Sequence, residues 1–204
     1  MKSLSIEGAW LYEPTLHTDD RGSFLEVFQR DAFQLATGRR LELAQVNCSV
    51  SRRGVIRGIH FADLPPGQAK YVTCLRGAVR DVLVDLRPGS PTYRTWEAVE
   101  LDDLSRRSVF LSEGLGHAFQ AVTDEATVMY LTTAGYRPAH EHGIDPLDPE
   151  LGIEWLPDTA PVLSGKDTSA PSLAEAEARG LLPAYEDCLR YLSSLAHPFS
   201  EETR

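Results

Sequence analysis

Long apolar runs and a basic surplus are both missing from this chain of 204 residues. The chain contains no run of about 18 apolar residues, the length needed to span a bilayer. Residues 1–10 contain no apolar segment typical of a signal peptide. We therefore expect a cytoplasmic protein without a membrane partner. The chain has 20 Lys and Arg against 30 Asp and Glu, and the formal net charge of −10 argues against nucleic acid as its main partner.

Cysteine is scarce, and its spacing excludes a fold held by disulfides. Cys48, Cys74 and Cys188 are odd in number and far apart, so they favour neither a disulfide framework nor a Cys-x-x-Cys zinc site. We expect all three to be small buried side chains. The length and an ordinary globular composition, 42% hydrophobic and 25% charged, predict one domain over residues 1–204.

Gly and Pro divide the middle of the chain into short β-rich runs. The clearest run, residues 79–86, alternates two kinds of side chain with the period of two that a strand requires. Further strands are expected over residues 44–50, 69–75, 95–101, 108–111, 118–122 and 127–133. Because no long helices separate these runs, they predict an all-β sandwich or barrel with a core of about residues 40–135.

Helices are expected only at the two ends of this region. Ser172 and Glu175 have the spacing of a capping box, and Gly180 follows as a stop signal. Helices are predicted over residues 31–37, 173–179 and 185–195, the last two within a helical C-terminal region of about 171–196. Residues 200–204 are expected to form a polar, frayed end.

His60 and His117 do not have the spacing of a metal site. Barrels that hold iron or zinc commonly carry a His-x-His pair near a glutamate, with ligands converging from adjacent strands. His60 has no second histidine two residues away, His117 stands alone, and His140 and His142 flank Glu141 in an expected polar loop. We therefore expect no metal and consider His60 as a general base instead, because a neutral imidazole titrates near physiological pH.

Polar side chains recur with strand spacing near this histidine. Gln45 and Asn47 share one face of an expected strand, and Gln68 and Lys70 share one face of another. Such faces are explained equally well by exposure to solvent or by a binding cavity inside a barrel. The residues alone leave both interpretations open.

Several motifs of this chain occur together, in the same order, in one known family. They are Arg57-Gly58-Ile59-His60, Pro66-Gly67-Gln68-Ala69-Lys70, the run from Asp81 to Arg87, Ser90-Pro91-Thr92, Gly116-His117-Ala118-Phe119, Tyr136-Arg137-Pro138 and Ser164-Gly165-Lys166-Asp167. With them the chain strongly resembles the dTDP-4-dehydrorhamnose 3,5-epimerase family over nearly its whole length. The resemblance implies a cupin-type β-jelly-roll barrel with a small helical C-terminal cap.

The resemblance also implies an isomerase that needs no cofactor. Family members act on dTDP-4-keto-6-deoxyglucose, whose ketone acidifies the hydrogens on carbons 3 and 5. The chain looks most similar to members that serve antibiotic deoxysugar pathways, some of which invert one carbon only. We therefore expect epimerisation that includes carbon 3, with carbon 5 left open.

Four residues match the family's catalytic positions. The resemblance makes His60 the base and Asp167 the carboxylate that orients it. It makes Lys70 the cation beside the ketone oxygen and Tyr130 the acid on the opposite face of the sugar. The alternatives are a turn aspartate, a surface lysine and a half-buried strand tyrosine.

Further positions match substrate-binding residues of the family. These are Arg21, Phe24, Glu26, Gln45, Asn47, Arg57, His117, Tyr136, Glu141 and Lys166. Family members are typically homodimers, so the resemblance implies a homodimer in which residues 4–12 pair between subunits. Arg21 or Glu26 would then complete the partner's site.

Two departures from the family pattern concern the sugar pocket. Where the family usually has Gly-Phe-Ala-His, the chain has Gly114-Leu115-Gly116-His117. Where the family usually has Ser-Pro-Thr-Phe-Gly, it has Ser90-Pro91-Thr92-Tyr93-Arg94. The alternatives to an epimerase are a ketoisomerase on the same fold, which usually carries a histidine pair, and a sugar-nucleotide-binding protein without turnover. The retained base and acid argue against the second alternative.

Overall fold

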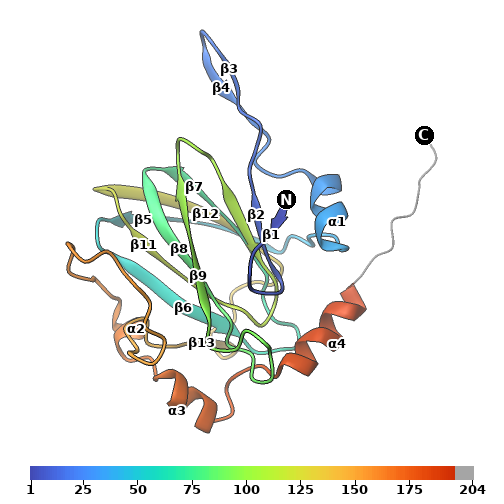
Figure 1. Ribbon diagram of the computed structural model, residues 1–204, viewed down its shortest axis with the longest axis vertical. Coiled ribbons are helices and arrows are strands. Elements are labelled where there is room, and N and C mark those ends of the chain that lie inside the picture. Colours follow the sequence, from blue (N-terminus) through green and yellow to red (C-terminus); the bar gives the residue numbers. More distant parts are fainter. Residues whose placement is uncertain (196–204) are drawn as a thin grey trace.

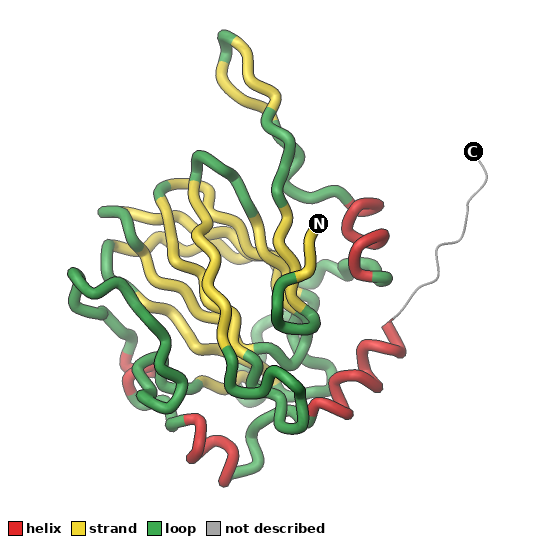
Figure 2. Tube along the Cα trace, in the orientation of Figure 1, coloured by secondary structure: helices red, strands yellow, loops and turns green. Residues whose placement is uncertain are grey.

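The computed structural model describes residues 1–195, which fold mainly into two facing antiparallel sheets (Figures 1 and 2). The six-stranded sheet runs in the order β1 (Lys2–Ser3), β2 (Ala9–Tyr12), β10 (Ser108–Leu111), β7 (Lys70–Arg76), β12 (Glu125–Thr132) and β5 (Gln45–Arg52). The five-stranded sheet runs in the order β13 (Glu141–Gly143), β6 (Ile56–Ala62), β11 (Gly116–Ala121), β8 (Ala78–Val84) and β9 (Trp96–Asp102). The predicted all-β jelly roll is confirmed.

The remaining elements lie outside these two sheets. They are the hairpin of β3 (His17–Asp19) and β4 (Gly22–Phe24) and the helices α1 (Arg30–Thr37), α2 (Gly165–Thr168), α3 (Leu173–Ala178) and α4 (Tyr185–Leu195). The capping box of Ser172 and Glu175 at the start of α3 is present, and Gly180 follows the helix with a φ of 66°. Residue 196 and the expected frayed end at 200–204 lie outside the described residues.

Three apolar clusters hold these layers together. One lies between the sheets and includes Val72 and Leu83. A second lies on the outer face of the five-stranded sheet, where Leu173 of α3 packs on strand side chains such as Phe61. In the third, Phe33 of α1 packs against the outer face of the six-stranded sheet. The outer faces of both sheets are thus covered in places, and the first cluster fills part of the space between the sheets.

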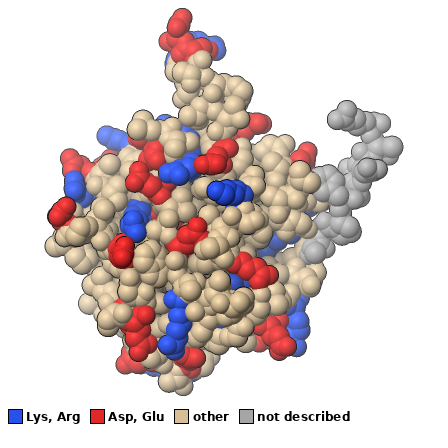
Figure 3. All heavy atoms as spheres, viewed as in Figure 1, with Lys and Arg blue, Asp and Glu red and all other residues tan. Residues whose placement is uncertain are grey.

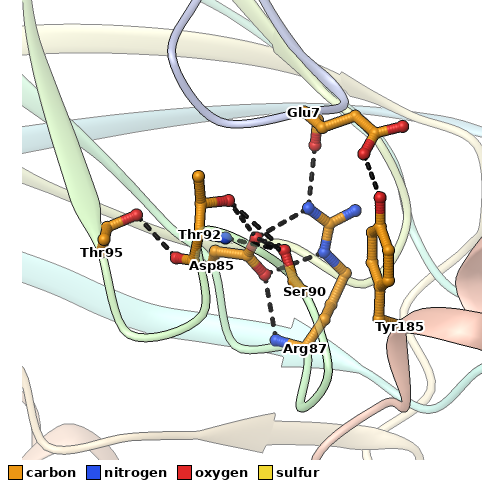
Figure 4. Close-up of polar contacts among 7 residues, drawn as sticks. All are labelled: Glu7, Asp85, Arg87, Ser90, Thr92, Thr95 and Tyr185. Carbon is orange, nitrogen blue, oxygen red and sulfur yellow. Dashed lines mark hydrogen bonds and ion pairs between the residues drawn. The ribbon is translucent and has the colours of Figure 1, made fainter.

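A buried ion pair closes the end of the barrel where β8 leads into the loop before β9 (Figure 4). Asp85 and Arg87 are both fully buried, and the Asp85 carboxylate accepts hydrogen bonds from Nε of Arg87 at 2.9 Å and from the hydroxyls of Ser90 at 2.6 Å and Thr92 at 2.7 Å. Burial raises the pKa of Asp85, but these hydrogen bonds outweigh it and leave the pKa below its ordinary value. The Ser90-Pro91-Thr92 motif therefore has a structural explanation.

The same arginine connects the N-terminal segment to the helix α4. Arg87 donates to the carbonyl oxygen of Glu7 at 2.9 Å, and its guanidinium lies over the ring of Tyr185, whose hydroxyl donates to the Glu7 carboxylate (Figure 4). Gly114 lies next to Arg87 with a φ of 92°, and a Cβ there would lie 2.5 Å from Sγ of Cys188 and 3.2 Å from Cδ of Arg87. We call Asp85, Arg87, Glu7 and Tyr185 the clasp.

Two strands next to the cavity are not predicted by the sequence. The strand β6 contains Gly58, whose φ of 114° and position against the backbone of His117 interrupt the regular strand pattern. The strand β13 occupies the expected polar loop, and it is only three residues long. Short or irregular strands carry too little period-two signal to be read from sequence.

Within one chain, β2 (Ala9–Tyr12) pairs with β1 on one side and with β10 on the other, and pairing of residues 4–12 between subunits stays a prediction. The expectation that all three cysteines are buried is wrong. Cys74 and Cys188 are buried, but Cys48 is exposed, because it lies on the outer face of the edge strand β5.

Charged side chains of both signs are interspersed on the face drawn in Figure 3. This mixture accompanies the net charge of −10. Within residues 1–195, none of the helices combines the length and apolarity that a membrane crossing demands.

Candidate active site

A cavity of about 640 Å³ opens between the two sheets. It lies within the range of volumes that small-molecule sites occupy. Its lining includes eleven of the fourteen residues expected from the sequence: Gln45, Asn47, Arg57, His60, Lys70, His117, Tyr130, Tyr136, Glu141, Lys166 and Asp167. The alternating polar residues of β5 thus face a cavity, which decides between the two interpretations that the sequence left open.

His60 and Asp167 form a hydrogen-bonded pair on one wall. The Nε2 atom of His60 lies 2.7 Å from Oδ1 of Asp167, whose Oδ2 accepts a hydrogen bond from the Ser164 hydroxyl at 2.8 Å. Ser164 is also the N-cap of α2 and accepts the backbone N–H of Asp167. The short helix therefore fixes the carboxylate against the histidine.

The environment keeps this pair ready to take a proton. Burial lowers the pKa of His60, and the nearby charge of Lys70 lowers it further, against the opposing hydrogen bond to Asp167. Burial raises the pKa of Asp167, but hydrogen bonds from His60 and Ser164 outweigh it, and the net pKa is lowered. At neutral pH the imidazole is therefore neutral beside an ionised carboxylate. With Nε2–H donated to Asp167, Nδ1 is the basic nitrogen.

The six-stranded sheet supplies a cation and a phenol to the facing wall. The Nζ atom of Lys70 lies 3.5 Å from the carbonyl oxygen of His60. Burial lowers the pKa of Lys70 to about 8, although the carboxylates of Glu141 and Asp81 raise it. Burial and Glu141 raise the pKa of Tyr130, so its hydroxyl keeps its proton at neutral pH.

A second histidine stands beside His60 on the same wall. His117 of β11 is paired directly opposite His60 of β6, and its Nε2 lies 2.8 Å from Oδ2 of Asp81. Asp81 is fully buried on β8.

Amide and histidine contacts order the rim of the cavity. Gln45 donates from Nε2 to Oδ1 of Asn47 at 2.6 Å and accepts the backbone N–H of Tyr136 at 3.0 Å. His140, just before β13, and His142, on β13, both contact the carboxylate of Asp63, at 3.1 and 2.5 Å. These contacts hold the strand that carries Glu141 against the edge of the sheet.

Three expected site residues do not line this cavity. Arg21 and Phe24 lie on the β3–β4 hairpin and Glu26 follows it, and all three are exposed. Figure 1 draws this hairpin extending away from the two sheets.

Other lining residues were not expected. Ser49 continues the face of Gln45 and Asn47, so the period of two could have identified it. Ser164 occupies an N-cap position three residues before Asp167. Phe119 and Val162 carry no comparable signal. Among residues 1–195, no group of three or more His, Cys, Asp or Glu side chains is arranged to hold a metal ion.

Comparison with known proteins agrees with this geometry. A family model described as dTDP-4-dehydrorhamnose 3,5-epimerase matches residues 3–175. The chain belongs to the dTDP-4-dehydrorhamnose 3,5-epimerase family. It is 58% identical over 195 residues to the dTDP-4-dehydrorhamnose 3,5-epimerase of Streptomyces griseus, covering 96% of this chain and 97% of that protein.

Solved structures of the family have the same fold. The crystal structure of NovW, a 4-keto-6-deoxy sugar epimerase from the novobiocin gene cluster of Streptomyces spheroides, is 59% identical, with a TM-score of 0.90 over 92% of this chain and 94% of that one. ChmJ, a 3'-monoepimerase from Streptomyces bikiniensis in complex with dTDP-quinovose, is 50% identical, with a TM-score of 0.94 over 96% of this chain and 99% of that one. Overall similarity thus does not separate 3-epimerases from 3,5-epimerases.

Proposed function

We propose that this protein epimerises dTDP-4-keto-6-deoxyglucose at carbon 3, with or without carbon 5, in the biosynthesis of a deoxysugar for a glycosylated natural product. The observation that carries the proposal is the neutral His60, paired with an ionised Asp167, on a cavity wall that faces Lys70 and Tyr130. We also propose that the protein works in the cytoplasm, because nucleotide-activated sugars are metabolites of that compartment.

The proposed reaction needs only acid and base chemistry. Nδ1 of His60 takes the proton from the carbon beside the ketone, and the electron pair of the broken C–H bond moves onto the ketone oxygen as an enolate. The ammonium of Lys70 stabilises this charge as it develops. The phenol of Tyr130 returns a proton to the same carbon from the facing wall, which inverts the centre.

Asp167 supports the first step in two ways. Its carboxylate fixes the His60 tautomer that leaves Nδ1 free, and it stabilises the imidazolium once the proton has been taken. Burial of Lys70 also serves the reaction, because a charge in a water-poor site acts more strongly on the enolate.

Polar residues along the cavity suit the nucleotide diphosphate. We infer that Arg57 and Lys166 contact phosphate oxygens, since a guanidinium fork and an ammonium are the usual cationic partners of phosphate. Gln45 and Asn47 offer amide groups to the sugar or nucleotide, and Tyr136 offers a ring for the base to pack on.

We further propose a homodimer in which the β3–β4 hairpin completes the partner's site. Phe24 is 67% exposed, an unusual position for an aromatic ring on a projecting hairpin. Val46 and Val50 are exposed beside Cys48 on the edge strand β5. An uncovered edge and an exposed aromatic both support a second copy of this chain as the occupant.

Mixing of inactive variants tests this arrangement. Arg21→Ala removes the hairpin cation and His60→Asn removes the base, so each homodimer should be inactive. If Arg21 acts across the interface, random mixing restores activity at about a quarter of the sites, because half of the dimers are mixed and each has one intact site. No recovery after exchange of subunits, or a monomer in sedimentation, contradicts the proposal.

Hydrogen exchange tests the reaction itself. Proton NMR of dTDP-4-keto-6-deoxyglucose in deuterated water should show enzyme-dependent exchange at carbon 3, and at carbon 5 if both centres react. Product analysis then establishes inversion. A carbonyl moved to carbon 3 would indicate a ketoisomerase instead, and exchange no faster than in buffer would indicate a binding protein.

A further inference from the structure

A carboxylate lies on the inner face of β8 where apolar packing surrounds it. Val79 and Leu83, its neighbours on that face, belong to the apolar cluster between the sheets, and Asp81 between them is fully buried. Burial of an ionised group costs free energy unless hydrogen bonds and opposite charges compensate. The neighbouring side chains on this face are apolar, so packing alone does not explain the carboxylate.

The hydrogen bonding of Asp81 is one-sided. Its Oδ2 lies 2.8 Å from Nε2 of His117, whereas its Oδ1 is buried and has no partner among residues 1–195. His117 lines the cavity beside His60. Within the described chain, Nδ1 of His117 forms no hydrogen bond. The ring is held at one nitrogen and its other nitrogen is left for a ligand.

We propose that Asp81 is a positioning residue of the epimerase site: it accepts Nε2–H of His117 and thereby fixes Nδ1 as an unprotonated acceptor for a hydroxyl of the substrate's sugar ring. This inference rests on the function proposed above. A 4-keto-6-deoxy sugar carries hydroxyls beside the reacting carbons. A hydrogen-bond acceptor on a rigid strand would fix the position of the sugar ring while His60 removes the proton.

The charge of Asp81 also raises the pKa of Lys70. Burial lowers the pKa of Lys70 to about 8, Glu141 and Asp81 raise it, and Lys166 lowers it. His60, Tyr130 and Asp167 are further titratable groups of this cavity lining, and the carbonyl oxygen of His60 lies 3.5 Å from Nζ of Lys70. Removal of the Asp81 charge therefore lowers the Lys70 pKa and moves the alkaline limb of activity to lower pH.

The tautomer of His117 can be measured without turnover. In protein labelled with ¹⁵N-histidine, with the His117 signals assigned by their loss in His117→Asn, the wild type should show Nε2 protonated and Nδ1 unprotonated. In Asp81→Asn the amide can donate to Nε2, so we expect a mixture or the opposite tautomer. Unchanged His117 signals would overturn the proposal, whether or not the proposed reaction occurs.

Kinetics supply the second test. We expect Asp81→Asn to lower kcat/KM by about 10- to 100-fold, as loss of a hydrogen bond that orients a functional histidine does in metal sites. The double variant with His117→Asn should be no slower than His117→Asn alone, because Asp81 acts through that ring. The alkaline limb should also move to lower pH in Asp81→Asn.

A matched control separates this role from a structural one. Asp148 is buried on the outside of the five-stranded sheet, where it accepts the backbone N–H groups of Glu150 and Leu173. Asp148→Asn should lower thermal stability and leave kcat/KM unchanged. A value for Asp81→Asn within twofold of wild type, or a loss that adds to that of His117→Asn, contradicts the proposal. If the wild type fails to turn over the substrate, the proposed function fails, but the tautomer measurement still tests whether Asp81 fixes the His117 ring.

Discussion

Two regions of this molecule contain a buried aspartate beside a basic side chain, and they differ in what remains unpaired. In the clasp, both carboxylate oxygens of Asp85 accept protein hydrogen bonds and Arg87 is fully buried. In the cavity, Asp167 is equally well bonded, but His60 is 33% exposed and its Nδ1 has no partner among residues 1–195. A free basic atom on an accessible wall distinguishes a reactive pair from a structural one.

The largest expected effect is on chemistry in the cavity. His60→Asn should slow carbon 3 exchange by about 10²- to 10⁴-fold, because the general base is lost. Asp167 keeps its hydrogen bond from Ser164, so stability should change by about 1 kcal/mol or less. NMR exchange rates measure the loss of activity, and a urea unfolding curve on the same protein measures the change in stability. A variant that stays active, or that does not fold, contradicts the assignment of His60 to a reactive pair.

Substitution of Lys70 tests the charge on the facing wall. Lys70→Met should lower kcat by about 10²- to 10³-fold, the usual loss for one donor to a developing oxyanion. For the wild type, activity should rise as His60 loses its proton below pH 6.5 and should fall as Lys70 loses its proton near its pKa of about 8. Lys70→Arg stays charged, so any activity it retains should lack the alkaline limb. An unchanged limb in that variant contradicts this role.

The clasp should respond in stability and not in rate. Arg87→Leu leaves Asp85 buried without its cation, and we expect a loss of about 3 to 5 kcal/mol in the free energy of unfolding. The kcat per folded molecule should be unchanged. Because the folded-state pKa of Asp85 is lowered, the stabilisation is fully present above about pH 4 and is lost as the pH falls through the folded pKa. Denaturant curves at several pH values measure this.

The smallest expected effect is at Ser164. Ser164→Ala removes the N-cap of α2 and the donor to Oδ2 of Asp167. Because Asp167 is then oriented less well, we expect the activation free energy to rise by about 1 kcal/mol, which lowers kcat about fivefold and leaves KM unchanged. Ser164→Thr retains the hydroxyl and serves as the control. A larger effect on KM than on kcat would assign Ser164 to substrate binding instead.

The sequence predicts most of the sheets because their strands alternate strongly. Seven strand predictions correspond to observed strands with ends that differ by a few residues, whereas the short strands β1, β3, β4 and β13 and the strand β6 were missed. In β6 the positive φ of Gly58 breaks the alternation, and β13 is stabilised by pairing with β6 and by the contacts of His140 and His142 with Asp63, which are distant in sequence.

The site shows where sequence reasoning stops. Period-two spacing brought Gln45 and Asn47 to one face, but only the three-dimensional structure decides that this face lines a cavity. Asp81 was recognised as part of a strand and not as a partner of His117, because the contact joins strands 36 residues apart. Cys48 was expected to be buried, since spacing does not say that β5 is an edge strand.

The central claim is that His60 and Tyr130 act on the sugar from facing walls of one cavity. The most direct measurement follows carbon 3 of dTDP-4-keto-6-deoxyglucose in deuterated water with Tyr130→Phe, by proton NMR for exchange and by product analysis for inversion. We predict that exchange continues while inversion is lost, because the base remains and the acid on the other face does not. Inversion at the wild-type rate in Tyr130→Phe would contradict the claim.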